Sequence, residues 1–498
     1  MKYSPDLFQL VKSLSKNEKR YVSLYLASGL MGSYSSSIEL FKALAKQKEH
    51  DDEALKKMLR PSIAKRFAAE KNKLFELILE SMRLFYNNTT TDRELISARY
   101  NAVFLLQRRL YSSAWKQLVK MDKLAEETDV AYFPLMSGFL RSYAYRNTSI
   151  TSSGYEYNYE KEVSHALSNI EILRTEVELY YLNTEVQRVD RFFTGGKERE
   201  ERLNELSKHP LLDLAVPLHS FFSKITRLEI ISHISTLLGD FELSLKTSLL
   251  RVELYLSDPA YLKRDLGRFC VALGNYIAQA IYIGRYDVYK ERRDEYADYI
   301  MRTKSYQSGN TEYLHFISIG FIDLSYAVYS EDLPFIKRLM PGLEKSFAIY
   351  RDQMRRDVFA YILYYLSVCY FLTGDEKRAL RYVNDFLDSV ADEENVMFCT
   401  YARLLRLMLL SKPGNEETVN GLARSAVRFM KMHKCAGEGE LKLSNVLETY
   451  PASEKAWKEL WRYSHTLPDK QLRSKESAVL HLGIWIERQT KLLGISLR

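Results

Sequence analysis

The fold is decided by residues 358–390, which read VFAYILYYLSVCYFLTGDEKRALRYVNDFLDSV. The first part, Val358 to Gly374, is a run of 17 residues without a charge that ends in glycine. The second part repeats apolar residues three and four positions apart, which predicts an amphipathic helix. Glycine favours the left-handed conformation that ends a helix, and Asp375 is a preferred cap for the following one. The stretch therefore predicts two helices joined by a tight turn.

Turns of this kind recur along the chain at a nearly constant spacing. They are predicted near Leu110, Gly154, Gly195, Gly239, Gly284, Ser330, Gly374 and Gly414, at intervals of 44, 41, 44, 45, 46, 44 and 40 residues. Two helices of about 18 residues, each roughly 27 Å long, fill such an interval together with two short turns. No stretch shows the alternation of a strand. The sequence predicts an all-α fold: an α-solenoid of stacked antiparallel helix hairpins with a period of about 44 residues.

Composition divides the chain into three segments. We expect an N-terminal basic helical segment at 1–90, the solenoid at 91–432 and a C-terminal helical cap at 433–498. Residues 87–91 (NNTTT) predict the linker between the first two segments. Within the first segment, residues 15–18 (SKNE) predict a capping box that opens a helix.

Tryptophan is concentrated in the last segment, which contains Trp457, Trp461 and Trp485, three of the four in the chain. A solenoid needs a cap over the exposed end of its core, and large rings are suited to that role. Buried tryptophans also anchor protein partners. Closure of the core is the favoured interpretation, and a partner site is the alternative.

The turn chemistry resembles that of the tetratricopeptide repeat (TPR). Ser367 and Tyr370 precede Gly374, and the small Ala379 follows it, as in that family's pattern of a small residue in the first helix and alanine in the second. The family's period is 34 residues, so the repeats here are longer. HEAT-type repeats match the length better but the turn chemistry less well. The resemblance implies a TPR-like α-solenoid that binds a partner in a groove. The opening LSKNEKRY and the closing WIERQ are also similar to a group of bacterial helical-repeat proteins without an assigned activity.

Bulk composition is that of an ordinary globular protein. The chain has 498 residues, of which 46% are hydrophobic and 27% charged. The longest uncharged runs are shorter than the roughly 20 residues of a membrane span, so we expect buried helices and no membrane partner. The four cysteines form no CxxC pair, which predicts isolated reduced thiols and a cytoplasmic location; they are Cys270, Cys369, Cys399 and Cys435.

Motifs for catalysis and cofactor binding are absent from the sequence. It has no phosphate-binding GxxxxGK[ST], no dinucleotide-binding GxGxxG after a strand, and no HExxH or GxSxG. The nine histidines form no pair four residues apart, so a local helical metal site is not expected. We therefore expect no enzyme, cofactor or metal. An enzyme whose site is assembled from distant residues remains a third hypothesis.

Positive charge is concentrated near the N-terminus. Residues 1–90 carry 16 Lys and Arg against 10 Asp and Glu, a net charge of +6, whereas the other 408 residues carry only +2. Lys16, Lys19 and Arg20 cluster there, and they fit either a solvated docking surface or contact with a nucleic-acid backbone.

A second group of cations stands at the start of the helix quoted above. Arg351, Arg355 and Arg356 crowd this position. A solvated helix face is the simpler interpretation, and a clamp for phosphate or carboxylate is the sharper one.

These observations together predict a non-enzymatic scaffold or adaptor. We expect it to bind a protein or peptide partner through the concave face of the solenoid, with the N-terminal segment as a second docking surface. The alternative is a regulator that contacts RNA or DNA through residues 1–90.

Overall fold

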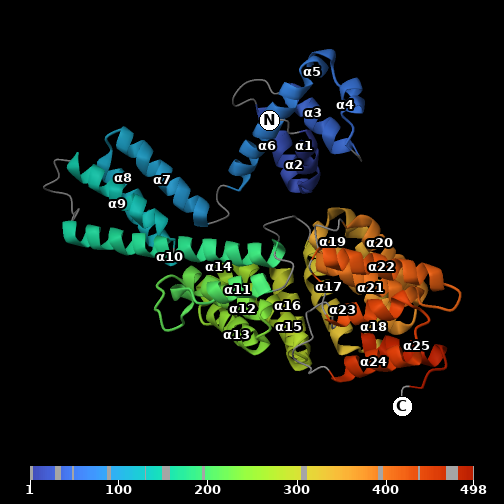
Figure 1. Ribbon diagram of the computed structural model, residues 1–498. Helices are drawn as coiled ribbons and strands as arrows, with labels where there is room; N and C mark the ends of the chain where they lie inside the picture. Colours follow the sequence, from blue (N-terminus) through green and yellow to red (C-terminus); the bar gives the residue numbers. More distant parts are fainter. Residues whose placement is uncertain are drawn as a thin grey trace. The chain divides into compact units, whose positions relative to one another are not determined.

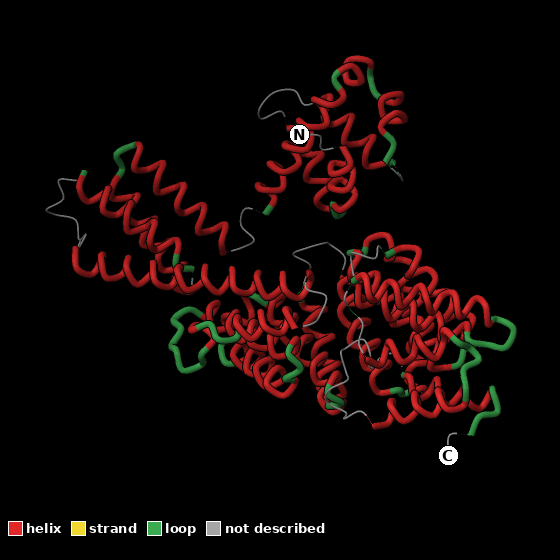
Figure 2. The backbone as a smooth tube through the Cα atoms, viewed as in Figure 1, coloured by secondary structure: helices red, strands yellow, loops and turns green. Residues whose placement is uncertain are grey.

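The computed structural model describes most of the chain, and these parts are 86% helical without a strand (Figure 2). The described residues are 4–28, 35–47, 50–86, 91–128, 130–147, 158–192, 197–303, 311–390, 396–433, 435, 438–466 and 481–496. The predicted all-α fold of stacked helix hairpins is confirmed, since consecutive helices pack against one another along the chain.

The chain forms two compact units, which divide inside one helix between Arg174 and Thr175. Unit 1 comprises residues 1–174 and 304–311, and unit 2 comprises the remainder (Figure 1). The helices of unit 1 are α1 (Ser4–Ser13), α2 (Lys16–Ser28), α3 (Ser35–Lys46), α4 (Asp52–Met58), α5 (Pro61–Lys65), α6 (Phe67–Phe85), α7 (Thr91–Gln107), α8 (Tyr111–Thr128), α9 (Tyr132–Arg146) and the first part of α10 (Tyr159–Phe192).

Unit 2 continues from the second part of α10. Its helices are α11 (Lys197–Leu206), η1 (Pro210–Leu212), α12 (Phe221–Leu237), α13 (Phe241–Leu256), α14 (Pro259–Arg264), α15 (Leu266–Tyr282), α16 (Tyr286–Arg302), α17 (Thr311–Ser330), α18 (Leu333–Tyr350), η2 (Arg351–Gln353), α19 (Arg356–Thr373), α20 (Glu376–Ser389), α21 (Val396–Leu410), α22 (Glu416–Met432), α23 (Glu438–Glu448), α24 (Glu454–Thr466) and α25 (Leu482–Leu492).

A residue in the left-handed conformation stands at each described turn that the period predicts. At four turns this residue is a glycine with φ between 80° and 92°; the glycines are Gly239, Gly284, Gly374 and Gly414. At the turns near Leu110 and Ser330 the left-handed residues are Arg109 and Glu331. The predicted turns at Gly154 and Gly195 lie outside the described residues.

The turn at Gly374 shows how the local sequence ends one helix and begins the next. The Gly374 N–H donates to the carbonyl of Phe371 at 3.1 Å, which closes α19. The Asp375 carboxylate then accepts the N–H of Arg378 at 3.1 Å, which caps α20. Ala379 is fully buried, as expected of a small residue where two helices approach.

One interval departs from the predicted pair of helices. Between the turns predicted at Gly154 and Gly195 the structure has a single continuous helix, α10, of 34 residues. Its sequence contains neither glycine nor proline, so nothing interrupts the backbone hydrogen bonds. The hairpin repeat is therefore broken at α10.

The core of unit 2 is closed by the C-terminal helix. Every residue of α19 from Ala360 to Leu372 is buried, and its last carbonyls accept hydrogen bonds from Arg488 of α25 at 2.9 and 3.0 Å. Trp485 is 1% exposed and donates its indole N–H to the Met408 carbonyl on α21 at 3.0 Å. Trp457 also lies in this core. These contacts support closure of the core and remove both rings from reach of a partner.

The N-terminal part of unit 1 has a hydrophobic cluster of its own, built from residues between Leu7 and Ile78. The capping box at residues 15–18 is confirmed: the Ser15 N–H donates to the Glu18 carboxylate at 2.6 Å, and the Glu18 N–H donates to the Ser15 hydroxyl at 3.3 Å. The predicted linker lies outside the described residues except for Thr91, where α7 begins.

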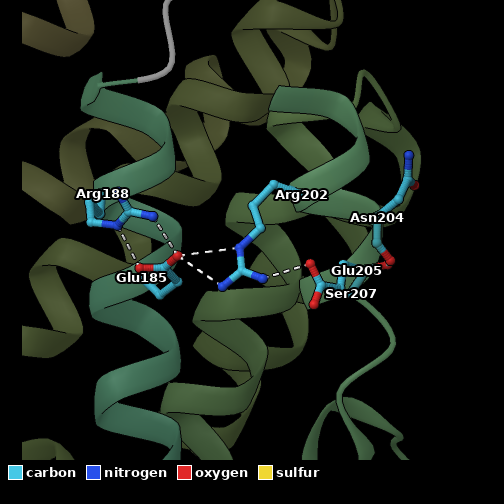
Figure 3. A network of polar contacts seen from close by, with 6 residues as sticks. All are labelled: Glu185, Arg188, Arg202, Asn204, Glu205 and Ser207. Atoms are coloured by element: carbon cyan, nitrogen blue, oxygen red, sulfur yellow. Dashed lines mark hydrogen bonds and ion pairs between the residues drawn. The ribbon is translucent and has the colours of Figure 1, made fainter. Parts of the chain in front are cut away.

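An ion-pair network fixes α11 to the second part of α10 (Figure 3). The Glu185 carboxylate accepts two hydrogen bonds from Arg188, at 2.7 and 2.9 Å, and two from Arg202 of α11, at 3.0 and 3.3 Å. Arg202 also pairs with Glu205 at 2.6 Å. The Arg188 hydrogen bonds, followed by those of Arg202, lower the pKa of Glu185 to about 2. The charged carboxylate is thus the centre of this anchor.

The turn geometry leads to a test with a matched control. Gly374→Ala should lower the free energy of unfolding by about 1–2 kcal/mol, because a Cβ is disfavoured at a φ of 84°. Gly342→Ala in α18 should be neutral or stabilise by about 0.5–1 kcal/mol, since its Cβ would meet no atom within 4 Å and alanine favours a helix. Urea unfolding followed by circular dichroism measures both, and equal effects would contradict the turn assignment.

The Glu185 network predicts a pH-dependent stability. Because folding lowers the pKa of Glu185 from 4.5 to about 2, the stabilisation is complete above pH 4.5 and is lost as the pH falls toward 2. Glu185→Gln should therefore cost about 1 kcal/mol or less near neutral pH and almost nothing at the acid end. Melting temperatures of both proteins across this range measure the effect. Glu200→Gln, on an exposed position of α11, is the control and should not change the pH profile.

Candidate functional site

The predicted N-terminal cations lie on α2. Lys16 and Arg20 are exposed and Lys19 is half-buried. All three follow the capping box within the first turns of this helix. They remain accessible to a partner, and the charge of Lys19 acts on the neighbouring Glu18 carboxylate.

Other cations of the same segment stabilise its own fold. The Lys12 ammonium donates to the backbone carbonyls of Ala45 and Gln47. Lys71 is buried and pairs with Asp52 at 2.6 Å. The basic excess counted from the sequence is therefore partly used within the segment and is not wholly available to a phosphate backbone.

The structure places the second group of arginines at the junction of α18 and α19. Arg351 pairs with Asp352 at 3.7 Å, and the Arg355 guanidinium binds the Asp357 carboxylate, with 3.1 Å between Nε and Oδ1. Burial by itself would raise the pKa of Asp357, but the hydrogen bonds and charge of Arg355 lower it below the usual range. Arg356 is the first residue of α19. Two of the three arginines therefore already pair with adjacent carboxylates, and both of these guanidinium groups remain more than half exposed.

The most deeply buried carboxylate among the described residues of unit 2 is that of Asp323, and it already accepts hydrogen bonds from neighbouring side chains. Asp323 of α17 accepts the Tyr289 hydroxyl at 2.8 Å and two N–H groups of Arg293, at 3.1 and 2.8 Å, both from α16. The neighbouring His315 is half-buried, and burial, with the charge of Arg293, lowers its pKa. The carboxylate is thus saturated with donors that join two helices, which is a structural role.

The described parts of the chain contain neither a metal-binding cluster nor a membrane-spanning helix. No set of three or more His, Cys, Asp or Glu side chains there is placed to hold a metal ion. No helix there combines the length and apolar character needed to cross a bilayer.

Helix α7 leaves a row of apolar side chains exposed. Ile96, Tyr100 and Phe104 are 44%, 64% and 55% exposed, and their spacing of four residues places them on one face. We call these three residues the α7 stripe. The opposite face of α7, which includes Leu95 and Ala102, is buried against α8 and α9. This helix is therefore apolar on two faces but covered on only one.

Arginines border the α7 stripe. The Arg99 guanidinium lies 6.0 Å from the ring centre of Tyr100, and that of Arg108 lies 5.3 Å from the ring centre of Phe104. Arg93, on the same side of the helix, stacks over Tyr86 at 5.2 Å. A cation over an aromatic face keeps its outward N–H groups for other acceptors. The stripe thus combines apolar area with donors for carboxylates.

Two neighbouring helices also carry exposed apolar side chains. On α9, Tyr132, Phe139 and Tyr143 share one face and are exposed. On the first part of α10, exposed apolar residues recur at helical spacing; they are Tyr159, Val163, Leu167 and Ile170, which we call the α10 stripe. Monomeric proteins seldom leave several such rows uncovered, so these rows are the candidate interaction surface.

Sequence reasoning did not find these stripes. The sequence feature that could have indicated them is that residues 95–106 are apolar on all sides of the predicted helix. Such a helix is normally buried. Only the arrangement of the neighbouring helices shows that one face stays uncovered.

Comparison with known proteins gives no relative. The chain matches no protein-family model, no curated protein and no solved structure.

Proposed function

We propose that this protein is a non-enzymatic scaffold or adaptor that binds a protein partner through the α7 stripe. The observation that carries the proposal is the exposure of Ile96, Tyr100 and Phe104 between arginines. Burial of such rings by a partner removes apolar area from water, and aromatic rings with few rotatable bonds lose little entropy on binding. They are the residue types that dominate the energetics of protein interfaces.

The partner we propose is an acidic amphipathic helix. Three apolar residues spaced four apart form a row that suits the apolar face of another helix. Arg93, Arg99 and Arg108 would meet carboxylates along the edges of that helix, because guanidinium groups bind carboxylates in well-defined pairs. A basic partner would be repelled by the same arginines.

The proposal assigns partner binding to the part of the solenoid that contains α7 and α9. α7 and α9 both pack on α8, and both carry exposed aromatic residues. The glycine turns and the buried Ala379 support kinship with TPR-like solenoids, in which such helices form extended binding surfaces. Three of the four cysteines are buried thiols, which supports a reducing, cytoplasmic location.

The proposal is tested by capture with matched variants. Tagged full-length protein, the variant Tyr100→Ala/Phe104→Ala and the control Met432→Ala are each used to recover proteins from the native lysate. Met432 is 70% exposed at the end of α22, so its truncation removes exposed apolar area of the same kind outside the stripe. A partner that uses the stripe should be retained by the control and lost, by at least about tenfold, with the double variant.

Two outcomes would contradict this function. Equal recovery of every protein by the double variant and the wild type would exclude the α7 stripe as the binding surface. Material that disappears after nuclease treatment would instead favour nucleic-acid contact through residues 1–90. Circular dichroism of each variant checks that helix content is unchanged.

A further inference from the structure

A polar groove borders the α7 stripe. It lies between α7 and α8 and has a volume of about 210 Å³. Its lining residues are Glu94, Ser97, Ala98 and Asn101 of α7 and Gln117 and Lys120 of α8. Ser97 and Asn101 each follow a residue of the stripe by one position, which is a rotation of about 100° round the helix. The groove is therefore on the side of the stripe that faces α8.

The polar side chains of this groove are not used within the fold. Among the described residues, no hydrogen bond or ion pair engages the five polar side chains that line it, which are those of Glu94, Ser97, Asn101, Gln117 and Lys120. By contrast, the carboxylates of Asp323 and Glu185 are each bound by arginine within the chain. Free groups of this kind can exchange water for the donors and acceptors of a partner.

The size of the groove restricts what can occupy it. Sites for separate small molecules measure about 300–1,000 Å³. The smaller volume here suits one side chain that belongs to a docked protein. A helix packed on the α7 stripe would have its axis about 8–10 Å from that of α7, so side chains on its flank would extend over the groove.

The chemistry of the groove selects a neutral occupant. Glu94 and Lys120 carry opposite charges, so neither an anion nor a cation is attracted without being repelled as well. Asn101 and Gln117 each offer two N–H donors and one carbonyl acceptor. A primary amide has the same complement and can pair with both. The backbone of a partner helix is already hydrogen-bonded to itself, so the amide has to come from a side chain.

We propose that the groove receives an asparagine or glutamine side chain of the partner helix that docks on the α7 stripe. This inference rests on the proposed function. The stripe supplies most of the affinity through its apolar area, whereas Asn101 and Gln117 determine specificity. A charged or apolar side chain at the same position of the partner would displace water from these amides without replacing all of its hydrogen bonds.

Selection of displayed helical peptides on the full-length protein tests the proposal. The peptide library has a fixed apolar row at helical spacing and fixed glutamates beside it, and its flank positions are randomised. Wild type should enrich asparagine or glutamine at one flank position at least about fivefold over charged or apolar residues. Asn101→Ala/Gln117→Ala should still bind peptides but lose this preference. The control Gln187→Ala/Asn204→Ala removes two exposed amides on α10 and α11 and should keep it.

The outcomes separate this inference from the proposed function. Enrichment of charged or apolar residues at the flank, the absence of any flank preference, or the same preference with Asn101→Ala/Gln117→Ala would each overturn the amide groove. The proposed function survives these results if Tyr100→Ala/Phe104→Ala abolishes peptide binding. Peptide binding that is absent in wild type, or unchanged by Tyr100→Ala/Phe104→Ala, would remove the proposed function and this inference with it. Circular dichroism checks that every variant is folded.

Discussion

A helical hairpin cannot bury both of its faces by itself, and this constraint governs the whole structure. Where hairpins follow one another without interruption, as around α19, each helix is enclosed by its neighbours and its residues are buried from Ala360 to Leu372. Where the repeat is interrupted by α10, the same construction leaves apolar rows uncovered on α7, α9 and α10. The buried core of unit 2 and the candidate binding surface of unit 1 therefore have the same cause: a hairpin needs neighbours to cover its apolar faces.

The regular part of the fold could be predicted because its determinants are local. Glycine has no Cβ, so Gly239, Gly284 and Gly374 mark left-handed turns wherever apolar helices flank them. Asp375 follows the last of these and caps the next helix as its chemistry requires. At Arg109 and Glu331 the same conformation occurs without glycine, and only the period pointed to those turns.

The rest follows from features that the repeat period does not describe. The two turns predicted around α10 suggested another pair of helices, although the 34 residues of α10 contain no residue that would break a helix. The predicted cations were chosen from sequence clustering, and the structure adds that Arg351 and Arg355 pair with Asp352 and Asp357. Exposure of Tyr100 cannot be predicted from an apolar helix, because it follows from which neighbours are absent.

The hydrogen bonds from Arg488 to the carbonyls of Phe371 and Leu372 have a consequence for the order of synthesis. These contacts join residues 117 and 116 positions apart in the chain. At about 5–20 residues per second, a ribosome needs roughly 6–23 s to add the residues between them. During that interval the carbonyls at the end of α19 lack their guanidinium donor and must stay hydrated until Arg488 is made.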